Sequence, residues 1–294
     1  MAITRVTQQM LSQRSLASIM GGLSQMAKYQ EQLETGKKLN RPSDDAAGTN
    51  TALRMRTALA EQDQYVRNAN DGKGWLSTVD STLSGVVTQL QRANTLALEG
   101  ANDGAMSQSA AEALATEIDQ IRESLLQQAN SDYLGRPVFG GTTAGSVAFD
   151  ANGNYVGDGG EVTRRVGSGV SVRVDSDGRT VFGEDGDNVF SHLSALSAAL
   201  RNGSDIQTSI DQLQTDVTRI SAAQADEGAR LNRLTQASDL ASQAQLRLKS
   251  SLSDVEDVEL AEVTINVNQA ELAYKAALAA AAKTLQPSLL DFLR

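Results

Sequence analysis

The chain contains no cysteine, one histidine and three prolines among its 294 residues. Without cysteine it has neither disulfides nor thiolate metal ligands. Its single histidine, His192, has no second histidine to share a metal site, and we expect a surface residue at the start of a helix rather than a catalytic base. The sequence therefore points away from catalysis, and we predict no catalytic residue, no cofactor and no metal ion.

One local pattern resembles a calcium loop but departs from it at a central position. Asp150, Asn152, Asn154 and Glu161 have the spacing of an EF-hand loop, but Tyr155 stands where that loop needs glycine. We therefore predict a turn between strands. An enzyme acting through residues 136–190 is the weakest alternative, because it needs a concave pocket with convergent carboxylates there.

Basic residues are outnumbered, and long apolar runs are missing. The chain has 26 basic and 36 acidic residues, a net charge of −10, and no basic block longer than two residues. Such a chain does not attract nucleic acid or anionic lipid, so we expect neither as a partner. No apolar run is long enough to cross a membrane, and the N-terminal residues lack the apolar core of a Sec signal peptide.

Few prolines leave long intervals free for helices. Residues 3–37 are predicted to form a helix that ends at Gly36, and Ser43 or Asp44 is predicted to cap the next one. A helical hairpin or bundle is expected over residues 45–130, and another long helix over 204–250. The first helix carries an apolar stripe at heptad spacing, formed by Leu16, Ile19, Leu23, Met26 and Leu33.

A last helix is predicted from about Asp254. Its stripe and apolar end comprise Leu260, Val263, Val267, Tyr274, Leu289, Leu290 and Phe292. Both terminal helices thus carry more apolar surface than they can bury in each other. An intramolecular coiled coil is one interpretation, but the two adjacent N-terminal stripes and the apolar end favour burial between subunits, so we assign these twelve stripe residues to subunit packing.

The middle of the chain changes character, because 13 of the 24 glycines lie between Gly135 and Phe190. Short β-branched runs alternate there with turn residues, and we predict a hairpin that pairs Val170–Val174 with Arg179–Phe182. The expected fold is mainly α with a β insertion. Long coiled-coil-like helices from both termini pack side by side, followed by a helical rod domain and a small outer β domain.

Several motifs together resemble the flagellin superfamily, and within it the FlgL type, the third hook-associated protein. They are Gln32-Leu33-x-Thr35-Gly36-Lys37-Lys38-Leu39-Asn40-Arg41-Pro42-Ser43-Asp44-Asp45, Tyr65-x-Arg67-Asn68-Ala69-Asn70-Asp71-Gly72, Tyr133-Leu134-Gly135-Arg136 and Ser288-Leu289-Leu290-Asp291-Phe292-Leu293. The resemblance covers residues 1–145 and 250–294, and the glycine-rich middle is similar only in kind. One departure, Asp44-Asp45-Ala46-Ala47-Gly48, looks like flagellin, which is therefore the alternative within the superfamily.

The resemblance implies a structural subunit of the bacterial flagellum that connects hook to filament. Its implied domains are an inner-tube domain (1–40 and 253–294), a helical rod domain (41–135 and 190–252) and an inserted β domain (136–189). Implied partners are neighbouring copies, the adjoining hook-associated protein, flagellin, and an export chaperone on the C-terminal helix. The implied location is the extracellular flagellum, reached without a cleaved signal peptide. A cytosolic coiled-coil scaffold is the alternative from another class.

Overall fold

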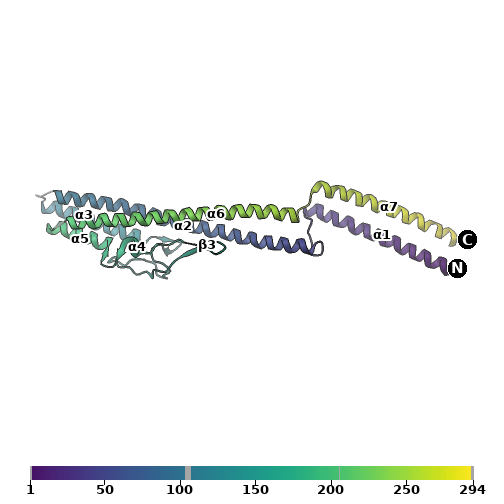
Figure 1. The fold of residues 1–294 in the computed structure, drawn as a ribbon, viewed down its shortest axis with the longest axis horizontal. Helices are drawn as coiled ribbons and strands as arrows, with labels where there is room; N and C mark the ends of the chain where they lie inside the picture. Colours follow the sequence, from purple (N-terminus) through teal and green to yellow (C-terminus); the bar gives the residue numbers. More distant parts are fainter. Residues whose placement is uncertain (1, 103–106, 205, 293–294) are drawn as a thin grey trace. The chain divides into compact units, whose positions relative to one another are not determined.

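The computed structural model describes residues 2–102, 107–204 and 206–292. It forms two compact units, one made of residues 1–60 with 245–294 and the other of residues 61–244. Figure 1 shows long helices and a small strand-bearing region. The helices are α1 (Ala2–Thr35), α2 (Ala46–Asn102), α3 (Gln108–Ala129), α4 (Gly178–Phe182), α5 (Val189–Asn202), α6 (Gln207–Glu256) and α7 (Leu260–Phe292).

The core of the 61–244 unit is built by the apolar stripes of its helices. In α2 the heptad residues Val79, Leu83, Val86 and Leu90 are fully buried. They pack with Ile118 and Leu125 of α3, Leu193 and Leu196 of α5, and Leu213 and Ile220 of α6. The predicted helical hairpin over residues 45–130 is thus confirmed as α2 and α3, and the predicted long helix over 204–250 as α6. None of the described helices is both long and apolar enough to span a membrane.

The first two helix boundaries are set by single residues. Gly36 has a φ of 67°, which suits glycine, and it ends α1 as predicted. The predicted cap of α2 is wrong, because Asp45 takes that role and its Oδ1 accepts the backbone N–H groups of Ala47 and Gly48, each at 3.0 Å. Asp44 instead accepts the N–H of Arg41 at 2.9 Å and holds the preceding turn closed.

The predicted start of the last helix is also wrong. Helix α6 continues through Asp254 to Glu256, and α7 begins only at Leu260. The break is stabilised by pairing with another part of the chain, since Val258 donates its N–H to Gly36 O at 3.1 Å. A distant backbone partner of this kind leaves no local sequence signal.

The region between α3 and α5 holds three two-stranded antiparallel sheets. Their strands are β1 (Asp132–Tyr133), β2 (Arg136–Pro137), β3 (Thr163–Gly167), β4 (Val170–Arg173), β5 (Gly183–Glu184) and β6 (Asp187–Asn188). The expected β insertion is present, but its expected hairpin is wrong. Strand β4 pairs with β3, with Val172 opposite Arg164. Residues 178–182 form the helical turn α4, because Asp177 caps it by accepting the N–H of Arg179 at 2.9 Å.

The few aromatic residues concentrate in this region. Four of the five phenylalanines form one buried cluster, with ring centroids 5.1 Å apart for Phe139 and Phe182 and 5.2 Å apart for Phe149 and Phe190. Such ring pairs add to the free energy gained from buried area alone. The cluster gives the short strands, which could not be stable by themselves, an apolar centre shared with α5.

Candidate functional site: the paired terminal helices

Helices α1 and α7 run alongside each other and bury one narrow strip (Figure 1). Val263 is only 5% exposed. Ile19, Met26, Val267 and Tyr274 are half-buried. The ring of Tyr274 lies against Gly22, since a methyl group at Gly22 would be 3.8 Å from Tyr274 Cδ2. The predicted pairing of the two helices is therefore present, and a small residue in α1 gives room to a large one in α7.

Outside this strip the helix pair exposes many apolar side chains. Of the predicted packing residues, Leu16 is 62% exposed, Leu23 41%, Leu33 39% and Leu260 57%. The side chains of Leu289, Leu290 and Phe292 lie outside the described part of the structure. Further exposed apolar residues on the two helices, not among the predicted packing residues, are Met10, Met20, Ile265, Leu272 and Leu278.

The exposed residues of α7 point to a second stripe. Ile265 and Leu272 are 56% and 71% exposed, and they stand seven residues apart, which places them on one face of the helix. The predicted stripe contains Leu260 and Val267, also seven residues apart. The neighbouring stripe of Ile265 and Leu272 was not predicted, because it overlaps the first one in the sequence. A helix pair with apolar residues on several outer faces is suited to burial against further helices.

A polar cluster closes the base of the helix pair. Glu256, the last residue of α6, is 5% exposed and accepts hydrogen bonds from Arg56 Nη2 at 2.8 Å and Lys37 Nζ at 3.3 Å. Its backbone carbonyl accepts the N–H of Lys38 at 2.6 Å. Buried Gln32 of α1 donates to Lys38 O at 3.2 Å. The ends of α1 and α6 and the start of α2 are thereby joined around one carboxylate.

The negative charge of the Glu256 carboxylate is stabilised by its neighbours. Burial acts to raise the pKa of Glu256, but the hydrogen bonds and positive charges of Arg56 and Lys37 outweigh it, so the pKa lies below its ordinary value. The sequence around Glu256 carries no signal of this role, because its two partners are 200 and 219 residues away. No spacing rule connects residues at such distances.

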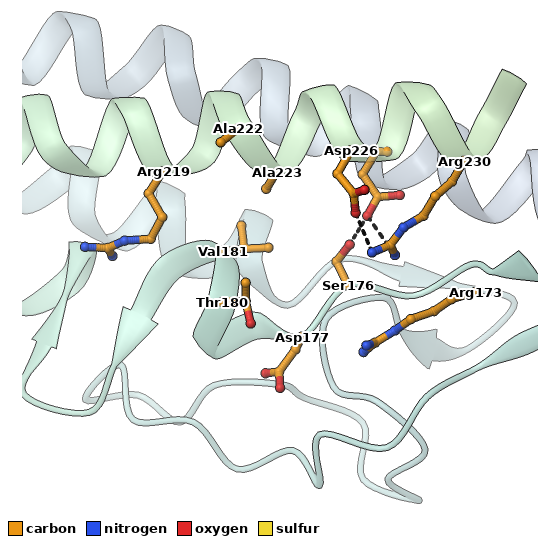
Figure 2. A pocket seen from close by; sticks show the side chains of 11 residues that line it. Arg173, Ser176, Asp177, Thr180, Val181, Arg219, Ala222, Ala223, Asp226 and Arg230 are labelled. Atoms are coloured by element: carbon orange, nitrogen blue, oxygen red, sulfur yellow. Dashed lines mark hydrogen bonds and ion pairs between the residues drawn. The ribbon is translucent and has the colours of Figure 1, made fainter.

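A hollow of about 330 Å³ lies in the 61–244 unit, between α6 and the segment 173–181 (Figure 2). Carboxylates do converge there, but arginines engage them: Asp226 pairs with Arg230 at 2.5 Å and Asp177 with Arg179 at 2.9 Å. Glu227 is 2% exposed, accepts from the Ser176 hydroxyl, and has its pKa raised by burial. The Ser176–Glu227 hydrogen bond, together with one from Arg230 Nη1 to the backbone carbonyl of Asp175 at 2.8 Å, attaches the strand-bearing segment to α6.

His192 is not the surface residue that we predicted. It is 5% exposed, because α5 turns it into the interior between two aspartates. Its Nδ1 lies 2.7 Å from Asp216 Oδ2 and its Nε2 lies 2.9 Å from Asp187 Oδ1. The predicted turn at Asp150 is confirmed, since Asp150 Oδ1 accepts the N–H groups of Asn152 and Asn154, each at 2.9 Å. In the described part of the chain no three acidic or histidine side chains gather as metal ligands.

Comparison with known proteins places the chain among flagellar proteins. A family model described as the bacterial flagellin N-terminal helical region matches residues 6–144. The flagellar hook-associated protein 3 of Escherichia coli is 30% identical over 270 residues, which cover 91% of this chain and 81% of that protein. The protein of the same name from Salmonella typhimurium is 28% identical over 282 residues, covering 87% and 89%. A flagellin from Halalkalibacterium halodurans is 24% identical over 274 residues, covering 92% and 93%.

Solved structures show the same fold. FlgL of Bacillus cereus superposes with a TM-score of 0.59 at 23% identity, over 68% of this chain and 99% of that one. The flagellar junction protein FlgL of Legionella pneumophila superposes with a TM-score of 0.58 at 14% identity, over 71% and 100%. Together with the sequence identity to hook-associated protein 3 over most of both chains, these likenesses show that the chain belongs to the FlgL family of flagellar hook-associated junction proteins, within the flagellin superfamily.

Proposed function

We propose that this chain polymerises as a short layer between hook and filament, and that α1 and α7 carry the contacts between copies. The apolar surface that these helices leave exposed supports the proposal most directly, with Leu16 at 62% and Leu260 at 57%. Burying one such leucine on assembly contributes about 1.5–3 kcal/mol. Several of them per subunit provide enough free energy to hold a layer together.

The proposed division of labour follows the chain. Residues 1–40 and 253–294 form the inner-tube domain, 41–135 and 190–252 the rod domain, and 136–189 the outward β domain. The twelve packing residues of the terminal stripes act in the first of these. Partners are neighbouring copies, the adjoining hook-associated protein on one side and filament subunits on the other.

The proposal also includes an export route and a structural, non-enzymatic role. The chain leaves the cell by the flagellar export route without cleavage, and a chaperone covers the apolar C-terminal helix until then. Its place of action is the extracellular flagellum. The role is structural and not enzymatic, which fits a hollow whose carboxylates are engaged by arginine side chains.

Deletion of the gene tests the junction role. We expect electron microscopy to show hooks without filaments, with flagellin shed into the medium, because filament subunits then lack a surface on which to assemble. Normal filaments in a strain without a second copy would contradict the proposal. Loss of the filament without shed flagellin would mean that the chain is itself a flagellin.

A charged triple variant tests the assembly surface. Leu16→Glu, Leu23→Glu and Leu260→Glu should together abolish incorporation into flagella while Trp75 in the other unit stays buried. The matched control, Gln13→Glu with Ser24→Glu and Gln269→Glu, adds the same charge at exposed polar positions of α1 and α7. It should still restore filaments. If the leucine variant restores them equally well, these faces do not carry assembly.

A further inference from the structure

A glutamate interrupts the buried apolar stripe of α6. Leu213, Ile220 and Leu234 stand at multiples of seven residues from one another, and all three are fully buried. Glu227 holds the position seven residues after Ile220 and seven before Leu234, so it lies on the same helix face, and it is only 2% exposed. A carboxyl group at such a position stabilises the packing of a helix less than leucine does. Packing therefore does not explain the glutamate.

The carboxyl group of Glu227 is only partly satisfied by its neighbours. Its Oε1 accepts the Ser176 hydroxyl, and Arg230 Nη1 lies 3.5 Å from the same oxygen. Its Oε2 has no hydrogen-bond partner among the residues that the structure describes. An ionised carboxylate, which accepts hydrogen bonds at both oxygens, is therefore poorly stabilised here. Burial is the main cause that raises the pKa of Glu227, so the closed arrangement favours the protonated form.

Residues 175–177 lie against this carboxyl group. They are attached to α6 through the Ser176 hydroxyl and through Arg230, which donates to a backbone carbonyl of the segment at 2.8 Å. On either side, Val174 and Val181 belong to the core. The hollow of about 330 Å³ lies between this segment and α6 (Figure 2). Separation of the segment from α6 would thus bring the carboxyl group into contact with solvent while the core stays packed.

We propose that Glu227 and Ser176 form a pH-dependent latch, which holds residues 175–177 on α6 while the carboxyl group is protonated and releases them when it ionises. In the open state the carboxyl group is solvated and has the ordinary pKa of a glutamate, about 4.3. The latch is fully effective below that pH, and its contribution is lost as the pH rises through the higher pKa of the closed state. The latch is a property of the single chain, so its failure would leave the junction role untouched.

The other charged groups around the latch have partners of their own. These pairs are Asp226 with Arg230 at 2.5 Å, Asp175 with Arg173 at 2.9 Å and Asp177 with Arg179 at 2.9 Å. Arg219, which also lines the hollow, pairs with Asp216 at 3.1 Å. On α2, Asp80 accepts a hydrogen bond from Gln224 at 3.0 Å. Asp175 and Asp226 act to raise the pKa of Glu227, and Arg230 acts to lower it. Among the described acidic groups that line the hollow, Glu227 is thus the buried one with an unpartnered oxygen.

Hydrogen exchange of the full chain, followed by mass spectrometry, tests the latch. After correction for the intrinsic effect of pH, we expect the amides of residues 174–178 to exchange severalfold faster at pH 8 than at pH 5, because ionisation opens the latch. Glu227→Gln keeps a neutral side chain that can accept from Ser176, so its protection should not change with pH. Asp226→Asn, at an exposed neighbour that also contacts Arg230, is the control and should keep the pH dependence. Equal protection of the unaltered chain at both pH values, or an unchanged pH dependence in Glu227→Gln, would overturn the proposal.

A second test completes the apolar stripe. Glu227→Leu with Ser176→Ala removes both members of the latch, so we expect the melting temperature at pH 8 to rise by about 2–4 °C, because no carboxylate is then buried. Protection of the segment should no longer depend on pH. Ser176→Ala alone leaves Glu227 without its hydroxyl donor and should lower the melting temperature. A double variant whose segment still exchanges faster at pH 8 would overturn the latch, whatever its melting temperature.

Discussion

At the scale of single residues, His192 has the most unusual environment. Both of its ring nitrogens face carboxylate oxygens, at 2.7 Å and 2.9 Å, and carboxylates only accept hydrogen bonds. Both nitrogens must therefore donate, which requires the charged imidazolium. The hydrogen bond to Asp216 raises the pKa of His192 most strongly, and burial opposes it. Asp187, Asp211 and Arg219 line the hollow beside His192. Asp216 lies on the buried side of the ring and also pairs with Arg219 at 3.1 Å.

The raised pKa predicts a pH-dependent stability. The charged form contributes fully below the unfolded pKa of about 6.5, and its contribution is lost as the pH rises through the higher folded pKa. We expect His192→Gln to lower the free energy of unfolding by about 1–3 kcal/mol at pH 6 and by less at pH 9. Urea unfolding followed by the fluorescence of Trp75, the one tryptophan, measures this. A difference that stays constant between pH 6 and pH 9 would show that the imidazolium is not involved.

At the scale of the element, the neighbouring residues Asp44 and Asp45 stabilise different parts of the N-terminus of α2. Asp45 accepts the first free N–H groups of the helix, from Ala47 and Gly48, at 3.0 Å each. Asp44 bonds backward to Arg41 and pairs with Lys28 at 3.4 Å. The hydrogen bond from the Arg41 N–H keeps the pKa of Asp44 below its ordinary value. The turn and the helix start are thus held by two different carboxylates.

This division predicts unequal effects of truncation. Asp45→Ala should lower the free energy of unfolding by about 1 kcal/mol, because it leaves N–H groups at the helix start without their acceptor. Ser43→Ala is the control, since Ser43 is exposed and lies outside the helix. Its effect should stay within about 0.5 kcal/mol. Thermal unfolding followed by circular dichroism compares the two variants. Equal losses would mean that Ser43, one of the two caps predicted from the sequence, stabilises the helix start as much as Asp45 does.

At the scale of the whole molecule, apolar burial is unevenly divided. The continuous core consists of residues between Ala69 and Leu234, all within the 61–244 unit. The other unit buries a strip along α1 and α7 and leaves Leu16, Leu260 and Leu272 largely exposed. One unit therefore has its own core, and the other needs further partners to bury its apolar surface.

The unequal burial predicts independent folding of one unit. A chain limited to residues 61–244 should unfold cooperatively with Trp75 buried, because its core contains every member of the main cluster. Circular dichroism and tryptophan fluorescence during urea unfolding measure this. The whole chain should show the same transition for Trp75. A 61–244 chain without cooperative unfolding would mean that residues outside this range stabilise the core.

The long helices and the apolar faces they carry could be predicted from the sequence alone. Heptad spacing is a local property, so the helical hairpin or bundle over residues 45–130 was predicted from the sequence, and its heptad residues Val79, Leu83 and Leu90 are buried. Glycine at 36 marked the end of α1 for an equally local reason. The motifs around Asp44 and Tyr133 indicated the family. The mainly α fold with a β insertion followed from these patterns.

Which distant groups come into contact could not be predicted from the sequence, because it depends on how the elements pack. Glu256 lies between Arg56 and Lys37, His192 lies between Asp187 and Asp216, and residues 178–182 are helical rather than a strand. Each outcome depends on burial and on hydrogen-bond partners that other elements bring into place. Apolar periodicity depends only on residues that are close in sequence. A buried charged side chain or a helix cap is stabilised by a hydrogen-bond partner that the folded chain places within about 3 Å. That distance is fixed only when the elements have packed.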